Sequence, residues 1–163
     1  MTDERTAAVP DAPVFEMPPS VPPGMRLELS RARLLPGAQD ETERWMKMMH
    51  DRYDDCLDTL SAERMAFEAT FRHTDADGTE WLYHLSLYGE GTSGLDLSNP
   101  VNQAHQEYAM RCKEQGWEKM RPVLMLAPRP IRPALEAWGR EGQSTAPPEP
   151  VPIPSQRSIL FRG

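Results

Sequence analysis

Residues 65–88, MAFEATFRHTDADGTEWLYHLSLY, decide the fold of this chain. Apolar and polar side chains alternate at both ends of the stretch, with the period of two residues that a β-strand imposes. Between these ends, residues 75–78 combine Asp and Gly, which favour a tight turn. The stretch therefore predicts two antiparallel strands joined as a hairpin.

A strand and a helix are predicted before this hairpin. Residues 25–35 alternate well enough to form a strand, and Pro36 and Gly37 end it. From Asp40, a candidate N-cap, to Leu60, apolar side chains recur at the spacing of one amphipathic helix. This is the clearest helical pattern in the chain.

A second helix and a fourth strand are predicted after the hairpin. Asn99 and Pro100 suit the N-cap and the first position of a helix, which stops at Gly116. Residues 120–126 then form an apolar strand. The order β-α-β-β-α-β predicts an α+β, ferredoxin-like fold, in which two helices cover one face of a four-stranded antiparallel sheet.

The other face of this sheet also needs cover. The first, second and fourth predicted strands carry apolar residues on both sides. Two sheets that pack face to face would remove this apolar surface from water. The sequence therefore predicts a homodimer.

Proline divides the chain into three parts. Eleven of the 17 prolines lie in residues 1–24 and 139–163, so we expect a disordered N-terminal arm, a folded domain over residues 25–138 and a C-terminal Pro-rich linker. The linker ends in RSILFRG, residues 157–163. This ending has the form of a docking peptide with three apolar side chains for pockets on another protein: Ile159, Leu160 and Phe161. As an alternative, these side chains fold back onto the domain or its dimer mate.

Composition and charge argue against several classes of protein. The 163 residues include 25 acidic side chains and 18 Lys or Arg, a net charge of −7 that argues against a nucleic-acid binder. No apolar run is long enough for a transmembrane helix, and the acidic N-terminus does not resemble a secretory signal. Cys56 and Cys112 lie in predicted helices and are expected to be reduced core residues. We therefore expect a cytoplasmic protein without a membrane or nucleic-acid partner.

Three features together resemble a known superfamily: the run Arg31-Ala-Arg-Leu-Leu-Pro-Gly37 before an amphipathic helix, the hairpin, and Asn99-Pro-Val-Asn-Gln-Ala-His-Gln-Glu-Tyr108 at the start of the second helix. Over roughly residues 25–127 the chain resembles small bacterial proteins of the dimeric α+β barrel superfamily, above all a group of uncharacterised function. The resemblance implies a dimer with a pocket between the sheet and the helices of each subunit. Relatives with this fold include cofactor-independent monooxygenases, lactone isomerases, polyketide cyclases, haem-using enzymes and small-molecule sensors, so the chemistry stays open.

Strand alternation predicts one polar cluster on the hairpin. Glu68 and His84 belong to polar sets that can lie side by side on neighbouring strands, and Arg33 of the first strand could join them as an anion anchor. A carboxylate that orients an imidazole beside a guanidinium can act as a general acid and base. The alternative is a solvated or dimer-interface salt-bridge network on the outer face of the sheet.

A second candidate site lies on the second predicted helix. His105 belongs to the apolar stripe of this helix and should face the sheet, where burial tunes an imidazole near neutral pH. We predict His105 as the proton-transfer residue, with a hydrogen-bonded core histidine as the alternative. Tyr108, one turn further on, is predicted to bind the same ligand together with Trp45 and Met49 of the first helix.

The sequence contains no recognised metal or cofactor motif. His50 and Asp54 lie four residues apart on the first predicted helix, but no further ligand joins them at a characteristic spacing. A solvated acidic face is therefore the favoured interpretation. We predict no metal and no cofactor, although haem stays open, with His105 as its candidate proximal ligand.

Two functions follow from these patterns. The first is a homodimeric protein that binds a small, largely apolar metabolite, with acid/base chemistry of the cyclase, isomerase or cofactor-independent monooxygenase type if it is an enzyme. The alternative is an adaptor or cargo protein that is docked to a larger assembly through residues 157–163.

Overall fold

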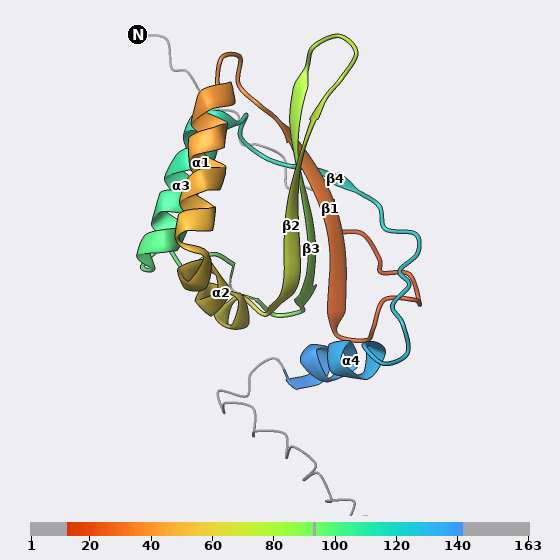
Figure 1. The fold of residues 1–163 in the computed structure, drawn as a ribbon. Coiled ribbons are helices and arrows are strands. Elements are labelled where there is room, and N and C mark those ends of the chain that lie inside the picture. The colour runs from red at the N-terminus through yellow and green to blue at the C-terminus, as the bar shows by residue number, and fades with distance from the viewer. Residues whose placement is uncertain (1–12, 93, 142–163) are drawn as a thin grey trace, which may run out of the picture.

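One antiparallel sheet, with helices packed against one of its faces, forms the centre of the molecule (Figure 1). The computed structural model describes residues 13–92 and 94–141. The elements follow one another as β1 (Met25–Arg33), α1 (Gln39–Asp51), α2 (Tyr53–Ala62), β2 (Met65–Thr74), β3 (Glu80–Gly89), α3 (Pro100–Cys112), β4 (Glu118–Met120) and α4 (Arg132–Glu141). The strand order β2-β3-β1-β4 is that of a ferredoxin-like sheet, so the predicted fold class is confirmed.

The register of the strands decides which side chains share a face. β1 pairs with β3 along its whole length, and β2 pairs with the other side of β3 after an irregularity between Met65 and Phe67. Ser30 and Thr70 both lie opposite His84 in this register. Even-numbered side chains of β1, of β3 and of β2 from Phe67 onward therefore share one face, called here the inner face, and odd-numbered side chains share the outer face. Before the irregularity, Met65 lies on the inner face.

Helices α1 and α3 lie next to each other against the inner face (Figure 1). Their sheet-facing positions carry side chains that are almost completely buried, including Trp45 of α1 and Val101 of α3. The start of α3 is as predicted, because the Asn99 side chain accepts a hydrogen bond from the Val101 amide at 3.0 Å and Pro100 occupies the first helical position. Asn99 and Pro100 thus fix where α3 begins beside the sheet.

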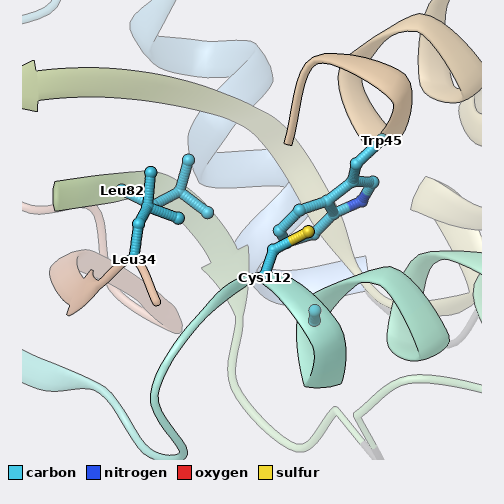
Figure 2. Close-up of a cluster of buried hydrophobic side chains, with 5 residues drawn as sticks. Leu34, Trp45, Leu82 and Cys112 are labelled. Carbon is cyan, nitrogen blue, oxygen red and sulfur yellow. The ribbon is translucent and has the colours of Figure 1, made fainter. Parts of the chain in front are cut away.

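Apolar packing between helices and sheet is concentrated in one cluster (Figure 2). Leu34 follows β1 and Leu82 belongs to β3, and both pack with Trp45 of α1 and with Ala109 and Cys112 of α3. Each of these five side chains is at most 9% exposed. Burial raises the pKa of the Cys112 thiol, which is consistent with the predicted role as a small core residue.

A second apolar cluster lies on the outer face. Met25 of β1 and Leu87 of β3 are buried there together with Val21. Helix α4 covers them with Leu135 and Trp138. The lower part of the outer face, near α4, is therefore closed by the two ends of the described chain.

Residues 13–24 belong to the arm for which composition predicts disorder, but they pack against β1. The Met17 sulfur accepts a hydrogen bond from the Leu27 amide at 3.3 Å, and the Arg26 guanidinium donates to the Phe15 carbonyl at 2.7 Å. The physical reason is the length of β4, which pairs only with residues 29–31 of β1 and leaves the edge at Leu27 open. The predicted docking residues Ile159, Leu160 and Phe161 lie outside the described residues.

The predicted single helix over residues 40–60 is two helices. The chain leaves helical geometry at Arg52, with φ −110° and ψ 33°, so that α2 diverges from the axis of α1 (Figure 1). The predicted N-cap Asp40 is also wrong, because Ala38 occupies that position. The Ala38 carbonyl accepts hydrogen bonds from both the amide and the hydroxyl of Thr42. The helix therefore begins two residues earlier than predicted, with Ala38 in place of Asp40 as the N-cap.

The predicted fourth strand over residues 120–126 is mostly wrong. β4 ends at Met120, and the chain continues without ladder pairing through Pro122, which has no amide proton to donate. Val123, Leu124 and Leu126 are 79%, 60% and 83% exposed. Within the described residues, no helix is long and apolar enough to cross a lipid bilayer.

Candidate functional site

A cavity of about 350 Å³ lies between the inner face of the sheet and the helices. α1 contributes Trp45 to its wall and α3 contributes His105. The strands contribute Glu68 and His84, and Trp117 closes the cavity beside β4. Next to the core cluster, close apolar packing thus gives way to a cavity whose apolar wall also carries polar side chains.

Glu68 of β2 and His84 of β3 form a hydrogen-bonded pair in this cavity. Glu68 Oε2 lies 3.0 Å from His84 Nε2, and about a third of each side chain stays exposed. The hydrogen bond from His84 holds the pKa of the Glu68 carboxyl below its usual range. Because a carboxylate can only accept, His84 donates from Nε2, and in the neutral ring the lone pair is then on Nδ1.

His105 is held by a different partner. The Trp45 indole Nε1 donates to His105 Nδ1 at 3.2 Å, and the two rings meet edge to face with centroids 5.1 Å apart. An indole N–H only donates, so Nδ1 of His105 carries no proton and the neutral ring carries its proton on Nε2. Burial lowers the pKa of His105 and favours this neutral form.

The cavity brings together residues that the sequence placed in two separate clusters. Glu68 and His84 lie on the inner face, beneath the helix that carries His105. The alternative of a solvated or dimer-interface salt-bridge network is wrong in its placement on the outer face, because the pair lies on the face that α1 and α3 cover (Figure 1). Their roles in a reaction remain predictions.

Arg33 does not join this site. It lies opposite Trp81 in the register and is therefore an odd-numbered residue of the outer face, exposed to solvent. Tyr108 packs beside the core cluster, under the Arg111 guanidinium at 4.6 Å, and does not line the main cavity. Met49 lines a small adjoining cavity of about 30 Å³ together with Glu68 and His105.

Strand residues that sequence reasoning missed form a second polar group in the main cavity. Glu28 Oε2 lies 2.8 Å from Lys119 Nζ and accepts a hydrogen bond from the Tyr88 hydroxyl at 3.3 Å. Burial raises the pKa of Tyr88. The alternation along residues 25–35 could have predicted the position of Glu28, since this residue lies on the same face of the strand as Ser30 and Ala32.

Glu63, directly after α2, is the most buried carboxyl group of the cavity. Only 8% of the residue is exposed, and its Oε1 accepts a hydrogen bond from Asn102 Nδ2 at 2.8 Å. Burial raises the pKa of Glu63. The sequence carried no signal for it, because a single Glu at the end of a helix is usually solvated.

The described residues contain no group of three or more His, Cys, Asp or Glu side chains placed to hold a metal ion. His50 and Asp54 are both exposed. The setting of His105 does not fit a proximal haem ligand, because such a histidine binds iron through one nitrogen and donates a proton from the other. Here Nδ1 accepts the Trp45 proton instead.

Comparisons with known proteins place the chain in a family but assign it no activity. Residues 25–133 match the model of a family of unknown function, DUF6176. No curated protein matches the chain. A crystal structure of a candidate antibiotic biosynthesis monooxygenase from Bacteroides thetaiotaomicron is similar, with 13% sequence identity, a TM-score of 0.42, and 63% of this chain and 91% of that chain covered. The chain belongs to the DUF6176 family of unknown function.

Proposed function

We propose that the cavity binds a small molecule and that His84, oriented by Glu68, exchanges a proton with it without a cofactor. The observation that carries the proposal is the 3.0 Å pair of Glu68 and His84 in the same cavity as His105. A cavity of about 350 Å³ lies within the usual range for small-molecule sites, roughly 300–1,000 Å³.

The two histidines have complementary roles in this proposal. Glu68 accepts the proton on Nε2 of His84, so Nδ1 of His84 is the base that takes a proton from the ligand. His105 is neutral and presents an N–H from Nε2, which stabilises negative charge that develops on the ligand. The proton-transfer role that the sequence suggested for His105 passes to His84.

The walls of the cavity suit an apolar ligand body. Trp45, Leu82 and Trp117 provide two indole rings and an aliphatic side chain around the polar groups. Apolar side chains next to polar groups lower the local dielectric and strengthen the polar contacts between them. A flat aromatic or cyclic molecule matches this arrangement.

A carbon acid that needs only a positioned base tests the proposal. In 5-nitrobenzisoxazole a base removes the ring C–H proton, the N–O bond breaks, and a coloured nitrophenolate forms. We expect the protein to accelerate this elimination and His84→Ala to lower kcat/KM about 100-fold, the lower range for general base catalysis. Glu68→Gln causes a smaller loss, because the base remains but is no longer oriented.

His73 provides a matched control for this experiment. It forms a similar pair with Asp75 at 3.2 Å, but the side chain is 60% exposed and lies outside the cavity. His73→Ala should leave kcat/KM unchanged. Equal loss in the two variants, or no acceleration by the parent protein, would contradict the proposal.

We also propose that the protein forms a homodimer through the outer face of the sheet. Phe67 and Phe71 of β2 point to this face and are 40% and 54% exposed. Leu85 and Tyr83 of β3 continue the surface and are half-buried. A second copy of the chain, packed sheet to sheet, would cover these side chains.

A further inference from the structure

We propose that the cavity selects ligands that carry a positive charge, namely a protonated amine on an aromatic or cyclic body, with Glu63 as the counter-charge. This inference rests on the proposed function, since it concerns the same cavity. It adds the substrate class, and it replaces the anion that the sequence suggested through Arg33.

The charges around the cavity favour a cation. Three carboxyl groups line it, from Glu28, Glu63 and Glu68, and Lys119 is the one ammonium group among the described lining residues. Lys119 is already bound to Glu28 at 2.8 Å. Lys119 is therefore not free to bind an anionic ligand, and two carboxyl groups remain in the described lining.

Those two carboxyl groups differ in their partners. His84 donates a hydrogen bond to Glu68 and keeps it ionised. Among the ion pairs of the described residues, none includes Glu63. The guanidinium of the adjacent Arg64 donates instead to the carbonyls of Trp138 and Gly139.

The position of Glu63 is unfavourable for an unpaired negative charge on two grounds. The residue is 92% buried, and it is the C-cap of α2, where the helix dipole presents its negative end. The hydrogen bond from Asn102 offsets part of this cost. An ammonium group in the cavity would supply the cation that Glu63 lacks.

A second cavity of about 330 Å³ that Glu63 also lines is acidic too. Asp58 of α2 and Asp96 line it together with Asn99 and Asn102, without a Lys or Arg among its described lining residues. Glu63 lines both cavities. Clefts of one sign concentrate ligands of the opposite sign, so the acidic lining of both cavities favours a cation near Glu63.

Three matched probes test the inference on the full-length chain: phenethylamine, the neutral phenethyl alcohol, and the anionic phenylacetate. They share a phenyl ring and differ in charge. Binding is followed by the NMR shifts of the Trp45 and Trp117 indole N–H groups, which both belong to the cavity wall. At neutral pH we expect the amine to bind at least about tenfold more tightly than the alcohol, and phenylacetate most weakly.

Glu63→Gln isolates the charge, because the amide keeps an oxygen for the Asn102 hydrogen bond. In this variant the Kd of phenethylamine should rise to that of phenethyl alcohol, whose own Kd stays unchanged. Asp40→Asn is the control, since Asp40 is an exposed carboxylate outside both cavities.

The outcomes separate this inference from the proposed function. Equal Kd values for amine and alcohol in the parent protein overturn the charge preference and leave a neutral-ligand site standing. Tighter binding of phenylacetate also overturns it. If none of the three probes shifts either indole, both proposals are contradicted. If Glu63→Gln does not fold, the order of the three Kd values in the parent protein still decides whether the cavity prefers a cation.

Discussion

The two faces of the sheet are built from the same strands but carry opposite surfaces. On the inner face, beneath the helices, Glu68 and His84 stand beside a cavity. On the outer face, Leu87 is fully buried, whereas Phe67 and Phe71 on β2 stay exposed. The inner face, which is usually apolar because helices pack on it, is thus partly polar. The outer face, which is usually polar because it contacts water, is partly apolar.

This inversion separates stability from function in the molecule. Polar groups beneath helices add little to stability, because each loses water that its hydrogen bonds only partly replace. Apolar packing on the inner face is confined to the cluster around Trp45 and Leu82. Departures from the pattern that stability favours are expected at functional sites, and this is the reason for proposing a ligand on the inner face and a second copy of the chain on the outer face.

The largest expected effect concerns the inner core cluster. Leu82 is 2% exposed, and Leu82→Ala should reduce the free energy of unfolding by about 2–5 kcal/mol through lost contacts and a new void. Leu85, on the outer face of the same strand, is only half-buried, so Leu85→Ala should cost less than half as much. Urea unfolding at several protein concentrations measures both losses. Equal losses would mean that the two faces contribute alike to stability.

The next effect tests the apolar outer face. Phe71→Glu places a charge within the proposed sheet-to-sheet contact and should raise the dimer Kd at least about 100-fold. Gln103→Glu is the control, because it adds the same charge at an exposed position of α3. Sedimentation velocity over a range of concentrations reports the state of each protein. A parent protein that sediments as a monomer at all concentrations would overturn the dimer.

Much of the fold follows from local patterns in the sequence. Alternation predicted the hairpin of β2 and β3, and Asn99 with Pro100 predicted the start of α3, because both signals depend on neighbouring residues. The break at Arg52 has no Pro or Gly to announce it. The early end of β4 did have a signal, since Pro122 cannot donate to a ladder.

The candidate site was only partly predictable. Alternation placed Glu68 beside His84, and the same parity would have placed Arg33 on the opposite face. Which face the helices cover is a long-range property, so the meeting of His84 with His105 could not be read from either segment alone. Glu63 was missed because burial at the end of a helix depends on α3, whose Asn102 closes over it.

Burial shifts the pKa values of His105 and Glu63 in opposite directions, so the two groups should give opposite pH responses. For His105, burial puts the folded pKa below the unfolded value of 6.5, so the unfolded chain binds the proton first and stability falls as pH decreases through about 6.5. His105→Gln keeps an acceptor for the Trp45 indole but does not titrate, so this loss should be shallower. Unfolding between about pH 7 and pH 5 measures it, with His50→Gln, exposed on α1, as the control. Parallel curves for His105→Gln and the parent would mean that the inner face leaves this histidine solvated.

The smallest effect is expected at Glu63, with the opposite sign. Burial raises the folded pKa of Glu63 above the ordinary value of 4.5. The contribution of Glu63 to the free energy of unfolding is therefore fully present below pH 4.5. It is lost as pH rises through the folded pKa, because the unfolded chain releases its proton at a lower pH than the folded protein does. Glu63→Gln should therefore be more stable than the parent near neutral pH and should lose this advantage toward pH 4.5. A variant that is less stable at every pH would show that the fold already neutralises the carboxylate. In that case the Glu63 carboxylate does not destabilise the fold, and a cationic ligand would gain no stabilisation by pairing with it.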